Sequence, residues 1–135
     1  MTTFRNKRVL ITGAARGMGR LMAERFSAKG AEVGLVDIEE DLLDEVADVL
    51  ERRGGTVQIF ACDLSEKKNI EELKERVSES MGRIDILANN AGVVAGGRYE
   101  EIADEQDELT LDVNINAVHW VTKAFLPDLK AGRDT

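Results

Sequence analysis

Four short runs of apolar residues recur along the chain, separated by longer segments of mixed character. Within each run nearly every position is aliphatic or β-branched, rather than every second position. This pattern is typical of strands that are buried on both faces of a parallel sheet. The predicted strands are Arg8–Thr12, Glu32–Asp37, Thr56–Ala61 and residues 84–89.

Between the predicted strands, apolar residues recur three or four positions apart, which is the period of an α-helix. Gly30, the pair Gly54 and Gly55, and Gly82 follow these segments and are expected to end the helices. The apolar faces consist of Met18, Leu21, Met22 and Phe26 in the first segment, of Leu42, Leu43, Val46, Val49 and Leu50 in the second, and of Ile70, Leu73, Val77 and Met81 in the third.

Individual residues predict two further helix boundaries. Ser65 is placed to cap the third helix, with Glu66 in its first turn. A fourth helix is expected over about residues 104–126, and we expect it to stop at Pro127, because proline cannot continue the ladder of intrahelical hydrogen bonds.

The alternation of strands and helices predicts βαβ units with right-handed crossovers. The fold class is therefore α/β, with a doubly wound parallel sheet. The length of 135 residues is that of one domain, so residues 1–135 are expected to form a single unit.

Composition and charge exclude several classes of protein. One cysteine and one histidine allow neither an internal disulfide nor a Cys/His zinc site. The formal net charge of −8 argues against nucleic acid as the main partner, since phosphate contacts need clustered Lys and Arg. No apolar run approaches the ~18–20 residues of a membrane span, and the amino terminus lacks the apolar region of a signal peptide. We therefore expect a cytoplasmic protein with no membrane partner.

The first candidate for chemistry is the glycine-rich stretch between the first predicted strand and helix. Gly13, Gly17 and Gly19 are spaced Gly-x-x-x-Gly-x-Gly, which differs from the Gly-x-Gly-x-x-Gly of the common dinucleotide fingerprint. Backbone N–H groups at a helix N-terminus bind pyrophosphate, and glycine is needed where the phosphates approach closely. The stretch predicts a phosphate-binding loop, although three glycines can also form a plain turn.

The acidic residue Asp37 ends the second predicted strand and is followed by Ile38 rather than by a basic residue. A carboxylate at this place can accept hydrogen bonds from the adenosine ribose hydroxyls and would repel a 2′-phosphate. Arg16 in the glycine loop argues the other way, since its cation could reach a 2′-phosphate. We weigh Asp37 more heavily and predict NAD rather than NADP as the cofactor.

Several motifs in this order resemble the short-chain dehydrogenase/reductase family. The stretch Thr12-Gly13-x-x-x-Gly17-x-Gly19 resembles its coenzyme loop, and Asp37 its NAD-selecting acid. Asp63, after the third predicted strand, resembles the residue that hydrogen-bonds the adenine amino group.

Two more motifs of that family follow along the chain. The stretch 89–92, Asn-Asn-Ala-Gly, resembles a segment that stabilises the family's sheet and lies against the cofactor. Asn114 resembles the catalytic asparagine. The cofactor-binding residues that the resemblance implies are Gly13, Arg16, Gly17, Met18, Gly19, Asp37, Ile38, Cys62, Asp63, Leu64, Asn90, Ala91 and Gly92.

The resemblance implies a Rossmann-like sheet in the order 3-2-1-4. It also implies an oxidoreductase that moves a hydride between the nicotinamide cofactor and a small-molecule alcohol or carbonyl substrate. Residues 112–127 further resemble the retinol and hydroxysteroid dehydrogenase branch, which suggests a lipophilic substrate.

The family's catalytic Tyr and the Lys four residues after it have no counterpart in this sequence. The single tyrosine, Tyr99, has Ala103 at that spacing and acidic neighbours, so we expect a loop or rim residue. His119 is expected to be a helix-face histidine, and Trp120 a packing residue. In the family the Tyr and Lys follow a fifth strand. We therefore expect the amino-terminal, coenzyme-binding half of such an enzyme, ending before that strand and inactive alone.

Two other interpretations stay open at this stage. The chain could be a non-catalytic nucleotide-binding or interaction module, or a half that works with a separately supplied second half. In the sheet order 3-2-1-4 the fourth strand lies at the edge of the sheet, and exposed apolar edges invite pairing. We therefore predict self-association or a homo-oligomer.

Overall fold

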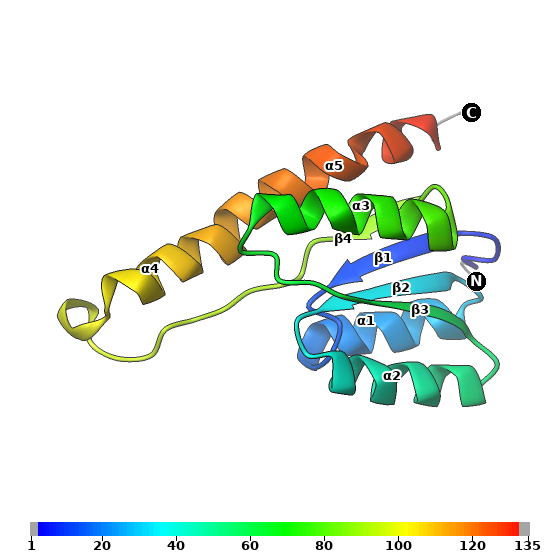
Figure 1. Ribbon diagram of the computed structural model, residues 1–135. Helices are drawn as coiled ribbons and strands as arrows, with labels where there is room; N and C mark the ends of the chain where they lie inside the picture. The colour runs from blue at the N-terminus through cyan, green and yellow to red at the C-terminus, as the bar shows by residue number, and fades with distance from the viewer. Residues whose placement is uncertain (1–2, 133–135) are drawn as a thin grey trace.

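In residues 3–132, which the computed structural model describes, four parallel strands form one sheet in the order β3-β2-β1-β4. This order and the parallel pairing confirm the predicted doubly wound sheet (Figure 1). The strands are β1 (Arg8–Thr12), β2 (Glu32–Asp37), β3 (Thr56–Ala61) and β4 (Ile86–Ala88).

Helices cover both faces of the sheet, with α1 (Gly17–Ala28) and α2 (Glu40–Arg52) on one face (Figure 1). The opposite face is covered by α3 (Lys67–Met81) and α5 (Ala117–Ala131). The side chains of β1 alternate between these two layers. Val9 and Ile11 pack with α1 and α2, whereas Leu10 packs with α3 and α5, and all three are fully buried. Burial on both faces explains why the strands read as continuous apolar runs.

The predicted fourth helix is interrupted and longer than expected. It consists of α4 (Asp104–Leu111), a π-helical segment η2 (Asp112–Asn116) and α5, and it follows the short 3-10 helix η1 (Tyr99–Glu101). The predicted stop at Pro127 is wrong, because α5 continues through Pro127 to Ala131.

Tertiary contacts explain why the helix tolerates this proline. A proline inside a helix costs about 3 kcal/mol. Two residues earlier, Phe125 is fully buried, which stabilises by about 1.5–3 kcal/mol. One residue later, the Asp128 carboxylate accepts hydrogen bonds from Lys74 Nζ at 2.8 Å and from the Ile84 N–H at 3.1 Å. Together these contacts offset the lost backbone hydrogen bond.

Two other predicted boundaries are corrected. Ser65 does not cap α3: its N–H donates to Asp63 Oδ1 at 2.9 Å, and Glu66, not Ser65, immediately precedes the helix. The local turn at Asp63 therefore delays the helix start. Strand β4 is shorter than residues 84–89 at both ends. At its start, the Asp85 side chain takes the place of a backbone acceptor for the Arg8 N–H at 2.9 Å. Beyond its end, the N–H groups of Asn90 and Ala91 donate to the Thr12 hydroxyl rather than to a strand backbone.

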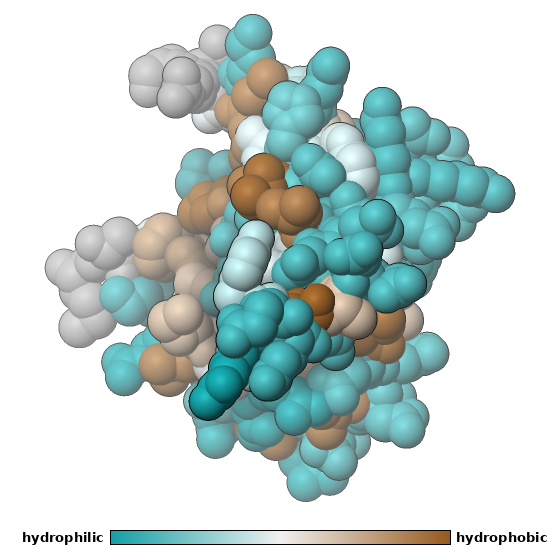
Figure 2. Space-filling view, turned by 90° about the vertical axis from the view of Figure 1, so that its left-hand side faces the viewer, coloured by the Kyte–Doolittle hydropathy of each residue, from teal (hydrophilic) through white to brown (hydrophobic). Residues whose placement is uncertain are grey.

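Strand β4 forms one edge of the sheet, and its three residues are only partly buried. Figure 2, which views the molecule from the end where α4 lies, shows apolar atoms gathered mainly on its left-hand side and hydrophilic atoms on its right. Along α4, η2 and α5 the larger exposed apolar side chains are Leu109, Leu111, Ile115, Val118 and Leu126. Met18 and Leu21 are exposed on α1. None of the helices within residues 3–132 combines the length and apolar character needed to cross a membrane.

Candidate functional site

The glycine loop connects the buried end of β1 to the first turn of α1. Gly13 and Gly17 have φ values of 65° and 59°, which residues other than glycine rarely adopt. A Cβ on Gly19 would overlap the carbonyl oxygen of Gly13 and lie 2.6 Å from Asn90 Nδ2. By contrast, a Cβ on Gly17 would meet no atom within 4 Å. The loop is therefore closely packed underneath at Gly19 and open above at Gly17.

The start of α1 presents backbone N–H groups that no side chain caps. Arg16 precedes the helix and makes no side-chain cap hydrogen bond, and the first turn contains no acidic residue. Such N–H groups carry a partial positive charge. The open side of the loop is therefore suited to an anionic group.

A hydrogen-bonded crosslink fixes the segment after β4 against this loop. Thr12 Oγ1 accepts the N–H groups of Asn90 and Ala91, each at 3.0 Å. In return, Asn90 Nδ2 donates to the carbonyl oxygens of Thr12 at 3.2 Å and Gly13 at 3.1 Å. Thr12 is 2% exposed, so water does not compete effectively for these bonds.

Asp37 at the end of β2 braces the same loop from the other side. Its Oδ2 accepts the Ala15 N–H at 3.1 Å, and its Oδ1 accepts the Glu39 N–H, also at 3.1 Å. Each carboxylate oxygen has a second lone pair, so the carboxylate keeps capacity for a ligand hydroxyl.

The guanidinium of Arg16 is paired with Glu39, just past Asp37. Arg16 Nε donates to Glu39 Oε2 at 3.0 Å, and its NH2 group bonds both carboxylate oxygens. The hydrogen bonds and negative charge of Glu39 raise the pKa of Arg16 above its ordinary value. The sequence pattern did not predict this pair.

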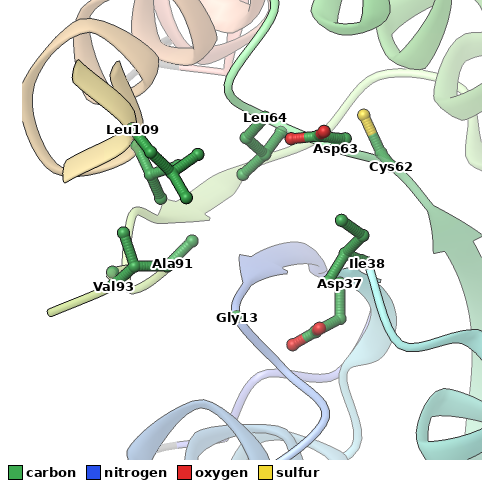
Figure 3. Close-up of a pocket in the computed structure, with 11 residues that line it drawn as sticks. Gly13, Asp37, Ile38, Cys62, Asp63, Leu64, Ala91, Val93 and Leu109 are labelled. Atoms are coloured by element: carbon green, nitrogen blue, oxygen red, sulfur yellow. The ribbon is translucent and has the colours of Figure 1, made fainter. Parts of the chain in front are cut away.

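These elements surround a cavity of about 280 Å³ at the carboxyl ends of the strands. Figure 3 shows the Asp37 and Asp63 carboxylates among mostly apolar side chains from the strand ends and α4. Its lining consists of Gly13, Asp37, Ile38, Cys62, Asp63, Leu64, Ala91, Gly92, Val93, Leu109 and Val113.

The Cys62–Leu64 side of the cavity is rigidly held. Asn69 Nδ2 donates to the Asp63 carbonyl at 3.0 Å, and Cys62 and Leu64 are buried. Burial raises the pKa of the Cys62 thiol to about 11, so this thiol is neutral at pH 7. Within residues 3–132, no cluster of three or more His, Cys, Asp and Glu residues could hold a metal ion.

Asn114 lies in the π-helical segment η2 and clamps the far wall of the cavity. Its Oδ1 accepts the Val93 N–H at 2.8 Å, and its Nδ2 donates to the Val93 carbonyl at 2.7 Å. The side chain thereby satisfies both backbone groups of an otherwise exposed loop residue. Asn114 thus positions the loop that follows β4.

The family assignment rests on comparison with known proteins. The family model described as short chain dehydrogenase matches residues 7–135. The chain belongs to the short-chain dehydrogenase family.

Curated relatives support this membership over part of their length. Human epidermal retinol dehydrogenase 2 is 39% identical over 124 residues, which are 91% of this chain and 40% of that protein. Oxidoreductase UcpA of Escherichia coli (strain K12) is 38% identical over 128 residues, or 95% of this chain and 48% of the relative. The chain thus spans less than half the length of these relatives.

Solved short-chain dehydrogenases share the fold. A short-chain dehydrogenase/reductase from Burkholderia phymatum in complex with NAD superposes with a TM-score of 0.91 and 30% identity, covering 100% of this chain and 48% of the other. A metagenomic short-chain oxidoreductase in complex with NADP gives the same TM-score and identity, covering 96% of this chain and 59% of the other.

Among the residues predicted as cofactor contacts, Asn90 supports the cavity from below through Thr12 and Gly13. Arg16, Gly17, Met18 and Gly19 form the adjoining loop and helix start. The predicted residues that line the cavity itself are Gly13, Asp37, Ile38, Cys62, Asp63, Leu64, Ala91 and Gly92.

Three residues that line the cavity were not predicted: Val93, Leu109 and Val113. Apolar residues on loops and helices resemble ordinary packing positions, so their types carried no signal. In the sequence, only the position of Val93 directly after residues 89–92 and of Val113 directly before Asn114 indicates that they lie near the site. Tyr99 is 85% exposed on η1, as expected for a rim residue, and His119 is exposed on α5.

Proposed function

We propose that this chain binds NAD(H) in the cavity at the carboxyl ends of its strands. The observation that carries the proposal is one juxtaposition. An uncapped helix N-terminus, a glycine loop with open space above Gly17 and the Asp37 carboxylate all meet beside one apolar cavity. The helix N-terminus and the glycine loop suit the diphosphate, the Asp37 carboxylate suits the ribose, and the apolar cavity suits the adenine.

The residues present fit such a nucleotide. The volume of about 280 Å³ is near the lower end for small-molecule sites, and the walls are mainly apolar. In our proposal the backbone N–H groups from Gly13 to Gly19 hold the diphosphate, with Met18 and Arg16 at the loop's outer side. Asp37 and Ile38 bind the adenosine ribose.

The adenine part is assigned to the wall opposite the loop. Leu64 and Cys62 would pack against the base, and the Asp63 carboxylate would accept a hydrogen bond from the adenine amino group. Ala91 and Gly92, held by the Thr12 crosslink, would lie along the nicotinamide half.

We further propose that the function is oxidoreduction of an alcohol or carbonyl. When bound, the nicotinamide supplies the hydride chemistry. Asn114 contributes by fixing the loop at Val93, so that the cavity wall keeps its shape. The names of relatives, such as retinol dehydrogenase and estradiol 17-beta-dehydrogenase, favour a lipophilic substrate.

Turnover is not expected from these 135 residues alone. The sequence contains one tyrosine, Tyr99, and Ala103 stands where a Tyr-x-x-x-Lys pair would place lysine. These residues therefore contain no Tyr-x-x-x-Lys pair that could donate a proton to the substrate oxygen. We propose that this chain is the coenzyme-binding part of the enzyme.

The test of the proposed site is a calorimetric titration with NADH of the protein and two variants. Asp37→Asn removes the charge and keeps one acceptor oxygen for the Ala15 N–H, while its NH2 group replaces the acceptor of the Glu39 N–H. It should weaken NADH binding about tenfold. Asp44→Asn, at an exposed position on α2, is the matched control and should bind like the unmodified protein. Equal affinities in all three proteins would refute the placement of the ribose at Asp37.

A further inference from the structure

A second hollow adjoins the cavity and shares one residue with it. It is lined by Arg16, Ile38, Glu39, Glu40, Asp41 and Leu42, and Ile38 also lines the cavity. Among these six residues Arg16 is the single basic side chain, and three are acidic. A group leaving the ribose at Asp37 and passing Ile38 would enter this hollow.

The one cation of the hollow is already engaged. Three hydrogen-bond contacts join the Arg16 guanidinium to Glu39, and the two side chains are 67% and 44% exposed. In the described residues, the Glu39 side chain bonds to Arg16 alone. Its backbone N–H, in contrast, donates to Asp37. Glu39 therefore links the ribose acid to the loop cation.

We propose that Glu39 is a coenzyme-selectivity residue: it holds the Arg16 guanidinium in an ion pair and thereby disfavours nucleotides with a 2′-phosphate. The inference rests on the proposed function, which places the adenosine ribose at Asp37. It resolves the conflict between Arg16 and Asp37, because an arginine that is paired with a carboxylate is not free to bind a phosphate.

Two effects set the size of the preference. Arg16 must leave an exposed ion pair before it can bind a phosphate, and such pairs contribute only a few-fold to an equilibrium. A phosphate in the hollow would also lie close to the Glu39 carboxylate, and repulsion at the water-exposed surface contributes a further few-fold. Removing the Glu39 side chain should therefore strengthen NADPH binding about tenfold.

The side chain of Glu39 can be removed without removing a second contact. Although Glu39 precedes α2, it makes no side-chain cap hydrogen bond, and its backbone contacts stay in Glu39→Ala. Glu24→Ala is the control for charge, because it removes an acidic side chain that pairs with two arginines, Arg20 and Arg53. None of these three residues lines the second hollow. Both variants change the net charge equally.

The experiment measures NADH and NADPH affinities by calorimetry for the unmodified protein, Glu39→Ala, Glu24→Ala and the double variant Arg16→Ala/Glu39→Ala. We expect Glu39→Ala to bind NADPH about tenfold more tightly, with NADH affinity changed less than twofold. The gain should be absent in Glu24→Ala and largely lost in the double variant, since the freed arginine provides it.

The alternative results separate this inference from the proposed function. If the unmodified protein binds NADH and Glu39→Ala shows unchanged NADPH affinity, the role of Glu39 is refuted and the site at Asp37 stands. A gain that persists in the double variant refutes the part played by Arg16. If folded, unmodified protein binds neither nucleotide, the proposed function fails and the selectivity inference fails with it.

Discussion

Replacing Thr12 by valine removes one hydroxyl oxygen while nearly preserving the shape of the side chain. In the native protein this oxygen accepts two backbone N–H groups, from Asn90 and Ala91, each at 3.0 Å. Valine offers no acceptor, and no cavity forms because a methyl group takes the place of the hydroxyl. The same hydroxyl donates to the Ala88 carbonyl oxygen at 3.5 Å, a long and weak contact. The perturbation therefore acts mainly on the crosslink between the glycine loop and the segment after β4.

The magnitude follows from the two N–H groups left without a partner. Each such group costs about 1–3 kcal/mol when water cannot reach it. Because both bonds lie in a partly buried region, we expect values near the lower limit, and a total loss of about 2–3 kcal/mol. This is a large share of the ~5–15 kcal/mol that holds a typical domain folded.

Thr12→Ser is the matched control, since serine keeps the oxygen and loses one methyl group, at a cost of about 1 kcal/mol. Urea unfolding followed by circular dichroism gives the free energy of each variant. We expect the order of stability to be native, then Thr12→Ser, then Thr12→Val. A valine variant as stable as the serine variant would refute the assignment of the hydroxyl as the acceptor that matters.

Three further predictions concern Gly19 in the glycine loop, the Asp128 carboxylate on α5 and the Cys62 thiol. Gly19→Ala should lose about 1–3 kcal/mol of stability and abolish NADH binding, because the added Cβ overlaps the carbonyl oxygen of Gly13. Gly96→Ala is the control: its added Cβ meets no atom within 4 Å, so it should match the native protein in urea unfolding and in NADH titration. Equal behaviour of the two variants would contradict the close packing at Gly19. Asp128→Ala should cost about 2–3 kcal/mol, because Lys74 loses its ion-pair partner and keeps one hydrogen bond, to Ser78, and the Ile84 N–H loses its acceptor. Lys74→Met should cost less in that background than alone, which a double-mutant cycle in urea measures, and strict additivity would speak against the pair. Because burial raises the pKa of Cys62 from 9.0 to about 11, the unfolded chain loses its thiol proton first, so this stabilisation is complete below pH 9 and lost by about pH 11. Between pH 8 and 10 the native protein should lose about 1 kcal/mol more than Cys62→Ala in urea unfolding, and parallel losses would exclude the effect.

The sheet could be predicted from the sequence because its central strands are buried on both faces. Three of the four predicted strands, Arg8–Thr12, Glu32–Asp37 and Thr56–Ala61, have the observed bounds. Strand β4 is shorter than predicted, since its apolar pattern extends beyond the part that pairs with β1.

The helix boundaries depended on contacts that no local pattern contains. Pro127 is tolerated because Asp128 meets Lys74, a residue 54 positions away in the chain. Ser65 is not the cap because the turn that the Asp63 carboxylate closes through the Ser65 N–H places Glu66, not Ser65, directly before α3. A contact distant in the chain decides the first case, and a turn between near neighbours decides the second.

Residues with distinctive chemistry were easier to predict as parts of the site than apolar ones. The glycine loop, Asp37 and Asp63 are found around one cavity, because parallel strands bring their carboxyl ends to the same edge of the sheet. Val93 and Leu109 have no such signature. The pairing of Arg16 with Glu39 needed the three-dimensional structure, since it depends on where two adjacent loops meet.

The central claim is that the cavity binds NAD(H) in preference to NADP(H), and parallel calorimetric titrations of the unmodified protein with NADH and NADPH test it most directly. The account predicts one saturable site per chain and NADH affinity at least about tenfold higher than NADPH affinity, a difference of about 1.4 kcal/mol. Equal or tighter binding of NADPH would contradict the preference. The absence of binding by either nucleotide, in a sample shown to be folded by circular dichroism, would contradict the site itself.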